Sequence, residues 1–231
     1  YEQEEIIDIL EEVTDILPTW LTGGSSFLEN TVENEARKEK IKEYCKTRET
    51  NNAMQIMNDI YHYIFAYVTI NGVIELDKLA EILQNNHGLD ITKENILSII
   101  KNDNYIKVIK NYLNIIDNDL ETIEELIKIK DDFSTYKIIE NPKITINEFD
   151  TKYDKIEKIL KEYQIEGEAS DTILSLFLIR ELSKEELNII LNCFSIKLPD
   201  KLTKELLGKL TKERKEMPTW EKNGFKSIEL N

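Results

Sequence analysis

The segment YIKVIKNYLNII, residues 105–116, decides the fold of this chain. Its centre, Lys110-Asn111, is a two-residue turn sequence in which Asn tolerates a positive φ. A turn at this point places four apolar side chains on one face of a two-stranded ribbon: Ile106, Val108, Leu113 and Ile115. Because the opposite face is mixed, the pattern predicts a β-hairpin that packs against the protein on one side only.

Helical patterns come before the hairpin. Residues 52–68 are apolar nearly all round, which predicts a buried helix, and VIE at 73–75 predicts a short strand. Two amphipathic helices follow, one ended by Gly88 and one opened by Thr92 as its N-cap. Helix, strand, helix, helix and ribbon is the order of a winged helix. We therefore expect a winged-helix-like unit over residues 51–117, with three strands because a lone hairpin is marginally stable.

The rest of the chain is predicted to be helical, so the fold class is mainly α with a small hairpin embedded in a multi-helix protein. Residues 1–50 predict two N-terminal helices, the first strongly acidic, and residues 118–217 predict a C-terminal helical bundle. Residues 218–231 form a tail that is expected to dock on this body. The helices expected in the bundle span 120–133, 145–163 with Thr145 and Glu148 as a capping box, 170–182, 183–194 with Ser183 and Glu186 as a capping box, and 200–217; residues 136–139 suggest a short extended piece.

Composition limits the classes of protein. The 231 residues carry 45 acidic and 30 basic side chains, and a net charge of -15 disfavours general binding to nucleic acid or to anionic membranes. No apolar run approaches the roughly 18 residues of a membrane span, and no signal-peptide pattern opens the chain. The two cysteines, Cys45 and Cys193, do not make a disulfide framework, which favours a cytoplasmic location. Since the chain begins at Tyr1 without Met, a fragment of a longer protein is an open alternative.

Sequence motifs for catalysis are not found. The chain has no glycine-rich phosphate loop, GxSxG or HExxH. Asp59 and His62 are spaced like half of a helical carboxylate metal site, but a matching second pair is missing, so a hydrogen-bonded histidine is the preferred interpretation. Both cysteines are interpreted as packing residues. The sequence therefore predicts a non-enzymatic protein with no cofactor and no metal.

Nucleic-acid binding is the first alternative. A DNA-reading winged helix uses Arg and Lys for phosphate and guanine contacts. Residues 51–117 hold five lysines, no arginine and eight acidic residues, a net charge of −3. The lysines that a DNA-binding regulator would use are Lys93, Lys101, Lys107 and Lys110. A third hypothesis, an acidic DNA mimic that inhibits a nucleic-acid enzyme, rests on the net charge and on residues 1–17, which hold seven acids and no base.

The preferred hypothesis is a cytoplasmic adaptor or regulatory protein that binds a protein partner. The contact residues expected from the sequence lie, as exposed side chains, on the wing and in the tail: Lys107, Lys110, Tyr112, Trp220 and Phe225. For Trp220 a second interpretation stays open. Because an indole in a polar tail is a good apolar anchor, this side chain would also suit a role in pinning the tail to the helical body.

Two segments carry a family resemblance. PTWEKNGFKSIEL at 218–230 and INGVIELDKLAEIL at 70–83, followed by the ribbon, resemble uncharacterised proteins of Firmicutes and their phages, over residues 55–231. Many proteins of that group carry a C-terminal SEC-C zinc motif. The cysteine-rich motif is absent here, so the resemblance assigns no metal ligands. It implies a bacterial or phage origin and the same architecture, and the group has no settled activity.

Overall fold

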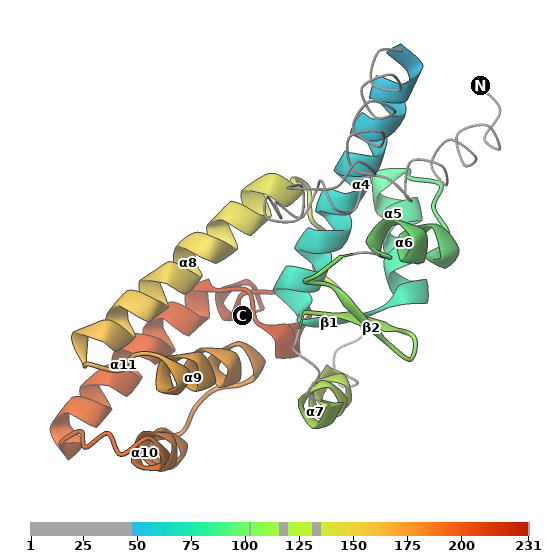
Figure 1. Cartoon of the computed structure of the whole chain (residues 1–231). Coiled ribbons are helices and arrows are strands. Elements are labelled where there is room, and N and C mark those ends of the chain that lie inside the picture. The colour runs from blue at the N-terminus through green and yellow to red at the C-terminus, as the bar shows by residue number, and fades with distance from the viewer. Residues whose placement is uncertain (1–47, 102, 116–119, 131–134, 231) are drawn as a thin grey trace, which may run out of the picture. The chain divides into compact units, whose positions relative to one another are not determined.

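The computed structural model describes residues 48–101, 103–115, 120–130 and 135–230, and this part of the chain is mainly helical with one small three-stranded antiparallel sheet (Figure 1). The helices predicted within residues 1–47 lie outside the described residues. The chain divides into two compact units. Unit 1 comprises the described residues of Tyr1–Phe65 and Ile74–Ile115, and unit 2 comprises those of Ala66–Val73 and Ile116–Asn231. Helix α4 (Arg48–Asn71) therefore contributes to both.

Unit 1 contains α4 up to Phe65, β1 (Val73–Glu75, of which Val73 is assigned to unit 2), α5 (Leu76–His87) and α6 (Lys93–Ile100), and then the hairpin. Gly88 ends α5 with a φ of 65° and Thr92 is the N-cap of α6, as the sequence predicts, and Thr92 also forms a reciprocal capping box with Asn95. The core consists of apolar side chains from the three helices: Met57, Ile60, Ile64, Leu79, Leu83, Ile96 and Ile100.

The hairpin consists of β2 (Lys107–Ile109) and β3 (Tyr112–Asn114), paired antiparallel. The predicted register is confirmed, because Val108 faces Leu113. The positive φ of the turn belongs to Lys110, at 56°, and not to Asn111 as the sequence suggested. The sheet has the order β1-β3-β2, so β3 is central and β2 is an edge strand.

The prediction that four apolar residues of the hairpin are buried together is only partly right. Leu113 is fully buried and Ile106 is 3% exposed, whereas Ile115 is half-buried and Val108 is 44% exposed. For Leu113 and Val108, position in the sheet explains the difference. A side chain on the central strand has neighbours on both sides, but one on the edge strand β2 is covered on one side only.

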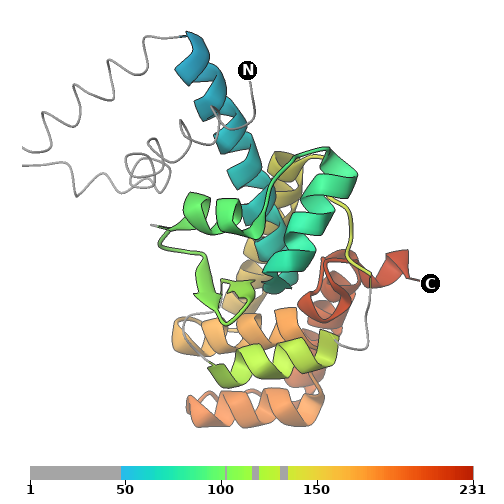
Figure 2. The ribbon, with the colours of Figure 1, turned by 90° about the vertical axis from the view of Figure 1, so that its right-hand side faces the viewer.

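Unit 2 contains the end of α4, α7 (Leu120–Lys130), α8 (Pro142–Glu162), α9 (Glu168–Ile179), α10 (Lys184–Cys193) and α11 (Asp200–Glu216), followed by two short 3-10 turns, η2 (Trp220–Lys222) and η3 (Ser227–Glu229). Figures 1 and 2 show the helices of this unit from two sides. Helices α8 and α11 run antiparallel and are joined by a regular series of polar pairs: Lys152–Glu216 at 2.7 Å, Lys155–Glu213 at 2.8 Å, Glu162–Lys209 at 2.9 Å and Tyr163–Glu205 at 2.9 Å.

Two capping boxes were predicted at helix starts in unit 2, and one of the two is present. Ser183 and Glu186 form the expected capping box of α10. The capping box expected at Thr145 is wrong, because α8 begins at Pro142, and the Asn141 side chain accepts a hydrogen bond from the N–H of Ile144 at 3.2 Å. An Asn-Pro pair suits the N-cap and first helical positions, and it takes the start of the helix three residues earlier.

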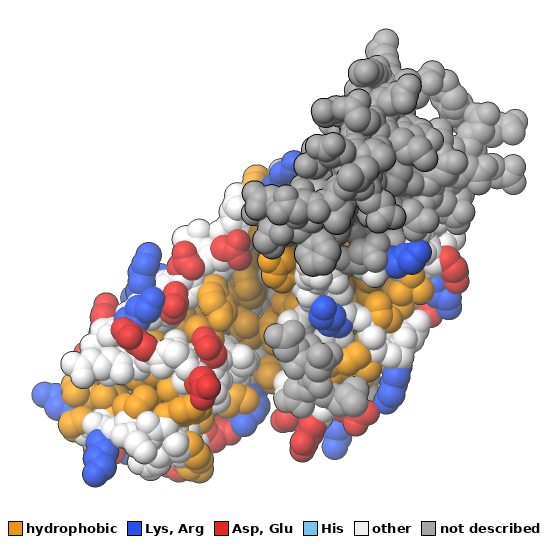
Figure 3. Space-filling view, viewed as in Figure 1, with side chains coloured by type: hydrophobic (Ala, Val, Ile, Leu, Met, Phe, Trp, Pro, Cys, Tyr) orange, Lys and Arg blue, Asp and Glu red, His pale blue; other side chains and the backbone are white. Residues whose placement is uncertain are grey.

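The extended piece predicted at residues 136–139 is not a regular strand, although the Lys137 N–H donates to the Asn223 carbonyl at 3.0 Å. Residues 218–230 pack against the end of α4. The Trp220 Nε1–H donates to the Thr69 carbonyl at 2.9 Å, and the indole lies directly against Gly72, where a Cβ atom would overlap it. Gly224 lies equally close to Ile70. Figure 3 shows acidic and basic side chains interspersed on one face of the molecule.

Candidate interaction surface

The strongest candidate surface in unit 1 is formed by α6, the loop after it and the hairpin. Three large apolar side chains are exposed there: Leu97 on α6 (36%), Tyr105 in the loop (61%) and Val108 on β2 (44%). Single exposed apolar residues are ordinary, but three of them on consecutive elements of a small unit are a feature of contact surfaces. We call this set, with the lysines of the hairpin, the wing surface.

Asp103 fixes the loop that opens the hairpin. Its carboxylate accepts hydrogen bonds from the N–H groups of Tyr105 and Ile106 at 2.7 and 2.8 Å, and from the Tyr61 hydroxyl on α4 at 2.6 Å. Burial and the Asp103 carboxylate raise the pKa of Tyr61 above its usual value. The hydroxyl therefore stays protonated, and the hydrogen bond persists across the physiological range of pH.

Asn111 fixes the tip of the hairpin. Its side-chain amide donates to Asp77 at 2.8 Å and to Glu75 at 3.3 Å, and its carbonyl accepts from the Leu76 N–H at 2.9 Å. The hydrogen bond from Asn111, followed by Lys93, lowers the pKa of Asp77. The hairpin is thus held at both ends, so the side chains between them are presented on a rigid element.

The predicted lysines differ in their surroundings. Lys93 forms an ion pair with Asp77 at 3.2 Å, and the Lys107 ammonium donates to the Asn104 carbonyl at 2.7 Å. Lys101 and Lys110 are exposed, and Tyr112 is half-buried. Lys101, Lys107 and Lys110 follow one another along the loop and hairpin, and Lys93 lies at the start of α6.

The tail residues belong to unit 2. Trp220 is only 6% exposed, so it is not the exposed contact that the sequence suggested, and its indole holds residues 218–230 through Thr69 and Gly72. The physical reason is area: an indole that finds an apolar site and an acceptor for its N–H is more stable buried. Phe225 is half-buried in the same segment.

The groups considered for metal or thiol chemistry stand apart. His62 forms a short hydrogen bond through Nδ1 with the Asn58 carbonyl, at 2.5 Å, within α4. Cys193 is exposed on α10, and Cys45 lies outside the described residues. Within the described ranges, no three His, Cys, Asp or Glu side chains are grouped so that they would hold a metal ion. None of the helices in these same residues is both long enough and apolar enough to cross a membrane.

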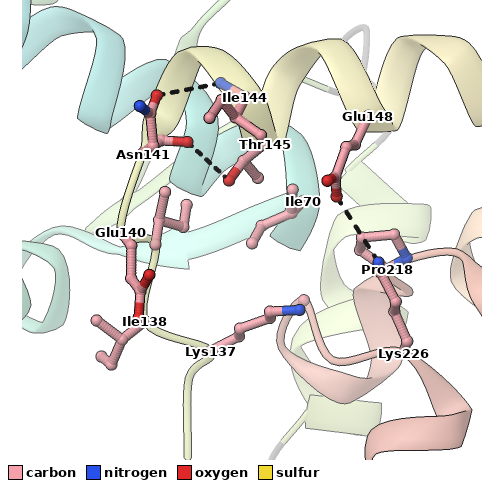
Figure 4. Close-up of a pocket in the computed structure, with 12 residues that line it drawn as sticks. Ile70, Lys137, Ile138, Glu140, Asn141, Ile144, Thr145, Glu148, Pro218 and Lys226 are labelled. Carbon is pink, nitrogen blue, oxygen red and sulfur yellow. Dashed lines mark hydrogen bonds and ion pairs between the residues drawn. The ribbon is translucent and has the colours of Figure 1, made fainter.

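A groove in unit 2 was not foreseen from the sequence. It consists of two adjoining hollows of about 310 and 460 Å³ that share Ile144, Glu148, Pro218 and Lys226. Figure 4 shows α8 along one side and Pro218 with Lys226 on the other. The three lysines of its lining are each paired with a glutamate: Lys137–Glu229 at 2.6 Å, Lys152–Glu216 at 2.7 Å and Lys226–Glu148 at 3.7 Å. Because its cations are neutralised in this way, the groove does not favour an anionic ligand.

Lys130, the last residue of α7, is a buried cation that sequence patterns did not single out. Its ammonium group donates to the Val73 carbonyl at 2.7 Å and lies 5.8 Å from the centre of the Tyr136 ring. Burial lowers the pKa of Lys130 well below its ordinary value. Since the group is enclosed and its hydrogen bond is to a backbone carbonyl, its role is structural.

Comparison of the chain with protein-family models, with curated proteins and with solved structures finds no match. The resemblance to the Firmicutes and phage proteins therefore stays a prediction.

Proposed function

We propose that this protein is a non-enzymatic adaptor or regulator of bacterial or phage origin, and that unit 1 is a winged-helix-like module that binds a protein partner through the wing surface. The order α4, β1, α5, α6, β2, β3 and the strand order β1-β3-β2 support a winged-helix-like arrangement. In such an arrangement α6 holds the position of the recognition helix and β2-β3 that of the wing.

The observation that carries the proposal is the chemistry of the exposed side chains on these two elements. Leu97, Tyr105 and Val108 occupy surface where a DNA-reading module would present groups for phosphates and base edges. Apolar side chains gain little from a phosphate backbone, whereas they bury well against another protein. The chain also has no arginine between Arg48 and Arg180.

The proposal is tested by comparing variants of the full chain as baits in a lysate of a Firmicutes bacterium. The double variant Tyr105→Glu, Val108→Glu places charges on the wing surface. Its matched control is Ile189→Glu, which changes a 62% exposed apolar residue on α10 of unit 2. We expect proteins retained by the wild type and the control to be lost from the double variant. Identical retention by all three baits would contradict the proposal.

A DNA-binding regulator is the second candidate, favoured by the element order and by Lys101, Lys107 and Lys110 along the loop and hairpin. It predicts retardation of duplex DNA at low salt, weakened in the double variant Lys107→Ala, Lys110→Ala. The third hypothesis, a DNA mimic, rests on residues 1–17, which lie outside the described part of the chain.

A further inference from the structure

Building on the proposed function, we infer that the partner contributes an extended, acidic segment with interspersed apolar side chains, which adds a strand to the β2 edge of the sheet. The inference starts from strand order. Among the residues that the structure describes, β2 is hydrogen-bonded to β3 on one side and is the last strand of the sheet on the other. An edge strand can pair with a further chain, and strand addition of this kind is a common mode of peptide recognition.

The register shows which backbone groups are offered. In a hairpin with a two-residue turn, Ile109 and Tyr112 beside the turn exchange hydrogen bonds, and the next pair, Val108 and Leu113, does not. The N–H and C=O of Val108 therefore point away from β3, toward the edge. The same residue is 44% exposed, so an incoming strand would meet both its backbone groups and an apolar side chain.

The charge around this edge determines the chemistry of the partner. Residues 101–112 contain three lysines and one acidic residue, in a chain whose net charge is -15. The single acid, Asp103, already accepts hydrogen bonds from Tyr61, Tyr105 and Ile106. The segment is therefore locally basic and is complementary to an acidic partner.

The pattern of side chains favours a peptide over nucleic acid. Strand β2 places Val108 on one face of the sheet and Lys107 and Ile109 on the other, and the exposed Tyr105 precedes the strand. A strand that alternates acidic and β-branched residues would satisfy Lys107 and cover Val108 at once. A phosphate oxygen can accept from the outward N–H of Val108, but a phosphate backbone has no N–H donor for its C=O, so only a peptide strand pairs with both groups.

Peptides selected from a random 12-residue display library on the full chain provide the probe. We expect enrichment of sequences that alternate Asp or Glu with Val or Ile. The best peptide is then synthesised in two forms, one unmodified and one N-methylated at alternate amides, and binding is followed by fluorescence anisotropy. N-methylation should weaken binding about tenfold or more, because it removes the donors of the added strand without altering the protein.

Variants of the protein locate the site. Val108→Pro removes the outward N–H, which is not used within the hairpin, and Val108→Ala is its control, since it shortens the side chain but keeps the donor. We expect the proline variant to bind far more weakly than the alanine variant, with an unchanged circular dichroism spectrum. The double variant Lys107→Gln, Lys110→Gln removes two positive charges and should weaken binding and reduce its dependence on salt.

Three results would overturn the inference: no enriched peptides, equal binding of the N-methylated and unmodified peptides, or displacement of the bound peptide by duplex DNA through the same lysines. The first two leave the proposed function standing if the bait experiment still depends on Tyr105 and Val108. The third would replace both with the nucleic-acid interpretation.

Discussion

Trp220 combines two kinds of interaction in unit 2. Its ring fills the space that Gly72 leaves by having no side chain, and its N–H satisfies the Thr69 carbonyl near the end of α4. Gly72 has a φ of 67°, in the region that favours glycine, so the backbone conformation and the close approach both need this residue. The tail and the end of α4 are thus fitted to one another.

Replacement of the indole tests this fit. Trp220→Ala should lower the free energy of unfolding by about 3–5 kcal/mol, because it empties a buried site. Trp220→Phe keeps much of the apolar area and loses the hydrogen bond to Thr69, so its loss should be smaller, about 1–2 kcal/mol. Urea denaturation followed by circular dichroism measures both. Equal and small losses would show that the indole is not an anchor.

Lys130 predicts a dependence of stability on pH. Its pKa in the folded protein is lowered from the ordinary 10.5 by burial, so the unfolded chain binds this proton more readily. The free energy of unfolding should therefore rise as pH increases from the pKa of Lys130 in the folded protein toward 10.5. Below that interval Lys130 is charged in both states, and the full cost of burying its charge is present. In Lys130→Met this rise disappears. The free energy of unfolding, measured against pH for both proteins, checks the prediction, and parallel curves would refute it.

At the scale of elements, the hairpin shows which structural features can be predicted from sequence and which cannot. Alternation and the turn position gave the register of β2 and β3 correctly, because both are local properties. The exposure of Val108 could not be read in this way, since it depends on β1 pairing with β3 and leaving β2 at the edge. The start of α8 was missed because two possible N-cap residues, Asn141 and Thr145, lie four residues apart, and a sequence pattern does not say which one prevails.

The N-terminal cap of α10 gives a prediction at the same scale. Hydrogen bonds from Ser183, followed by Arg180, lower the pKa of Glu186 from 4.5 to about 2. The contribution of the carboxylate to stability is complete above pH 4.5 and is lost as pH falls toward 2. Glu186→Gln should therefore flatten the acid limb of the stability curve, and thermal melts between these two pH values measure it.

Its control is Glu185→Gln on the same turn, for which we expect the acid limb to remain as in the wild type. An unchanged acid limb in Glu186→Gln would mean that the capping carboxylate does not contribute to acid stability.

The turn of the hairpin provides a second test among the elements. Lys110 has a φ of 56°, which costs a residue with a side chain about 1 kcal/mol, and glycine adopts it freely. Part of that gain is offset by the greater freedom of glycine in the unfolded chain, so Lys110→Gly should stabilise the protein by about 0.5 kcal/mol. Asn111→Gly, at the neighbouring position, should instead destabilise it, because the amide bonds to Glu75 and Asp77 are lost. Chemical denaturation of both variants distinguishes the two effects.

At the scale of the whole molecule, net charge is the dominant property. A charge of -15 on 231 residues produces self-repulsion that salt screens. Raising the ionic strength from about 0.01 to 0.15 M shortens the screening length from about 30 to 8 Å, so the melting temperature should rise and then level off. A fall in melting temperature over the same range would mean that the ion pairs of α8 and α11 outweigh the repulsion.

Sequence predicted the helical class and the three strands because these follow from periodicity within short windows. The groove beside α8 and the burial of Lys130 were missed, since they arise where segments distant in sequence meet. For Trp220 the sequence singled out the residue but not its surroundings. Its contact with Gly72, which is distant in sequence, is what distinguishes the buried anchor from the exposed contact.

The pairing of Trp220 with Thr69 spans 151 residues, and this separation has a consequence for biosynthesis. A ribosome releases the end of α4 long before it adds the indole that covers it. Until then the apolar surface around Gly72 is exposed to water. Unit 2 therefore completes its folding late in synthesis. A nascent polypeptide stalled before residue 220 is expected to bind chaperones through this exposed surface.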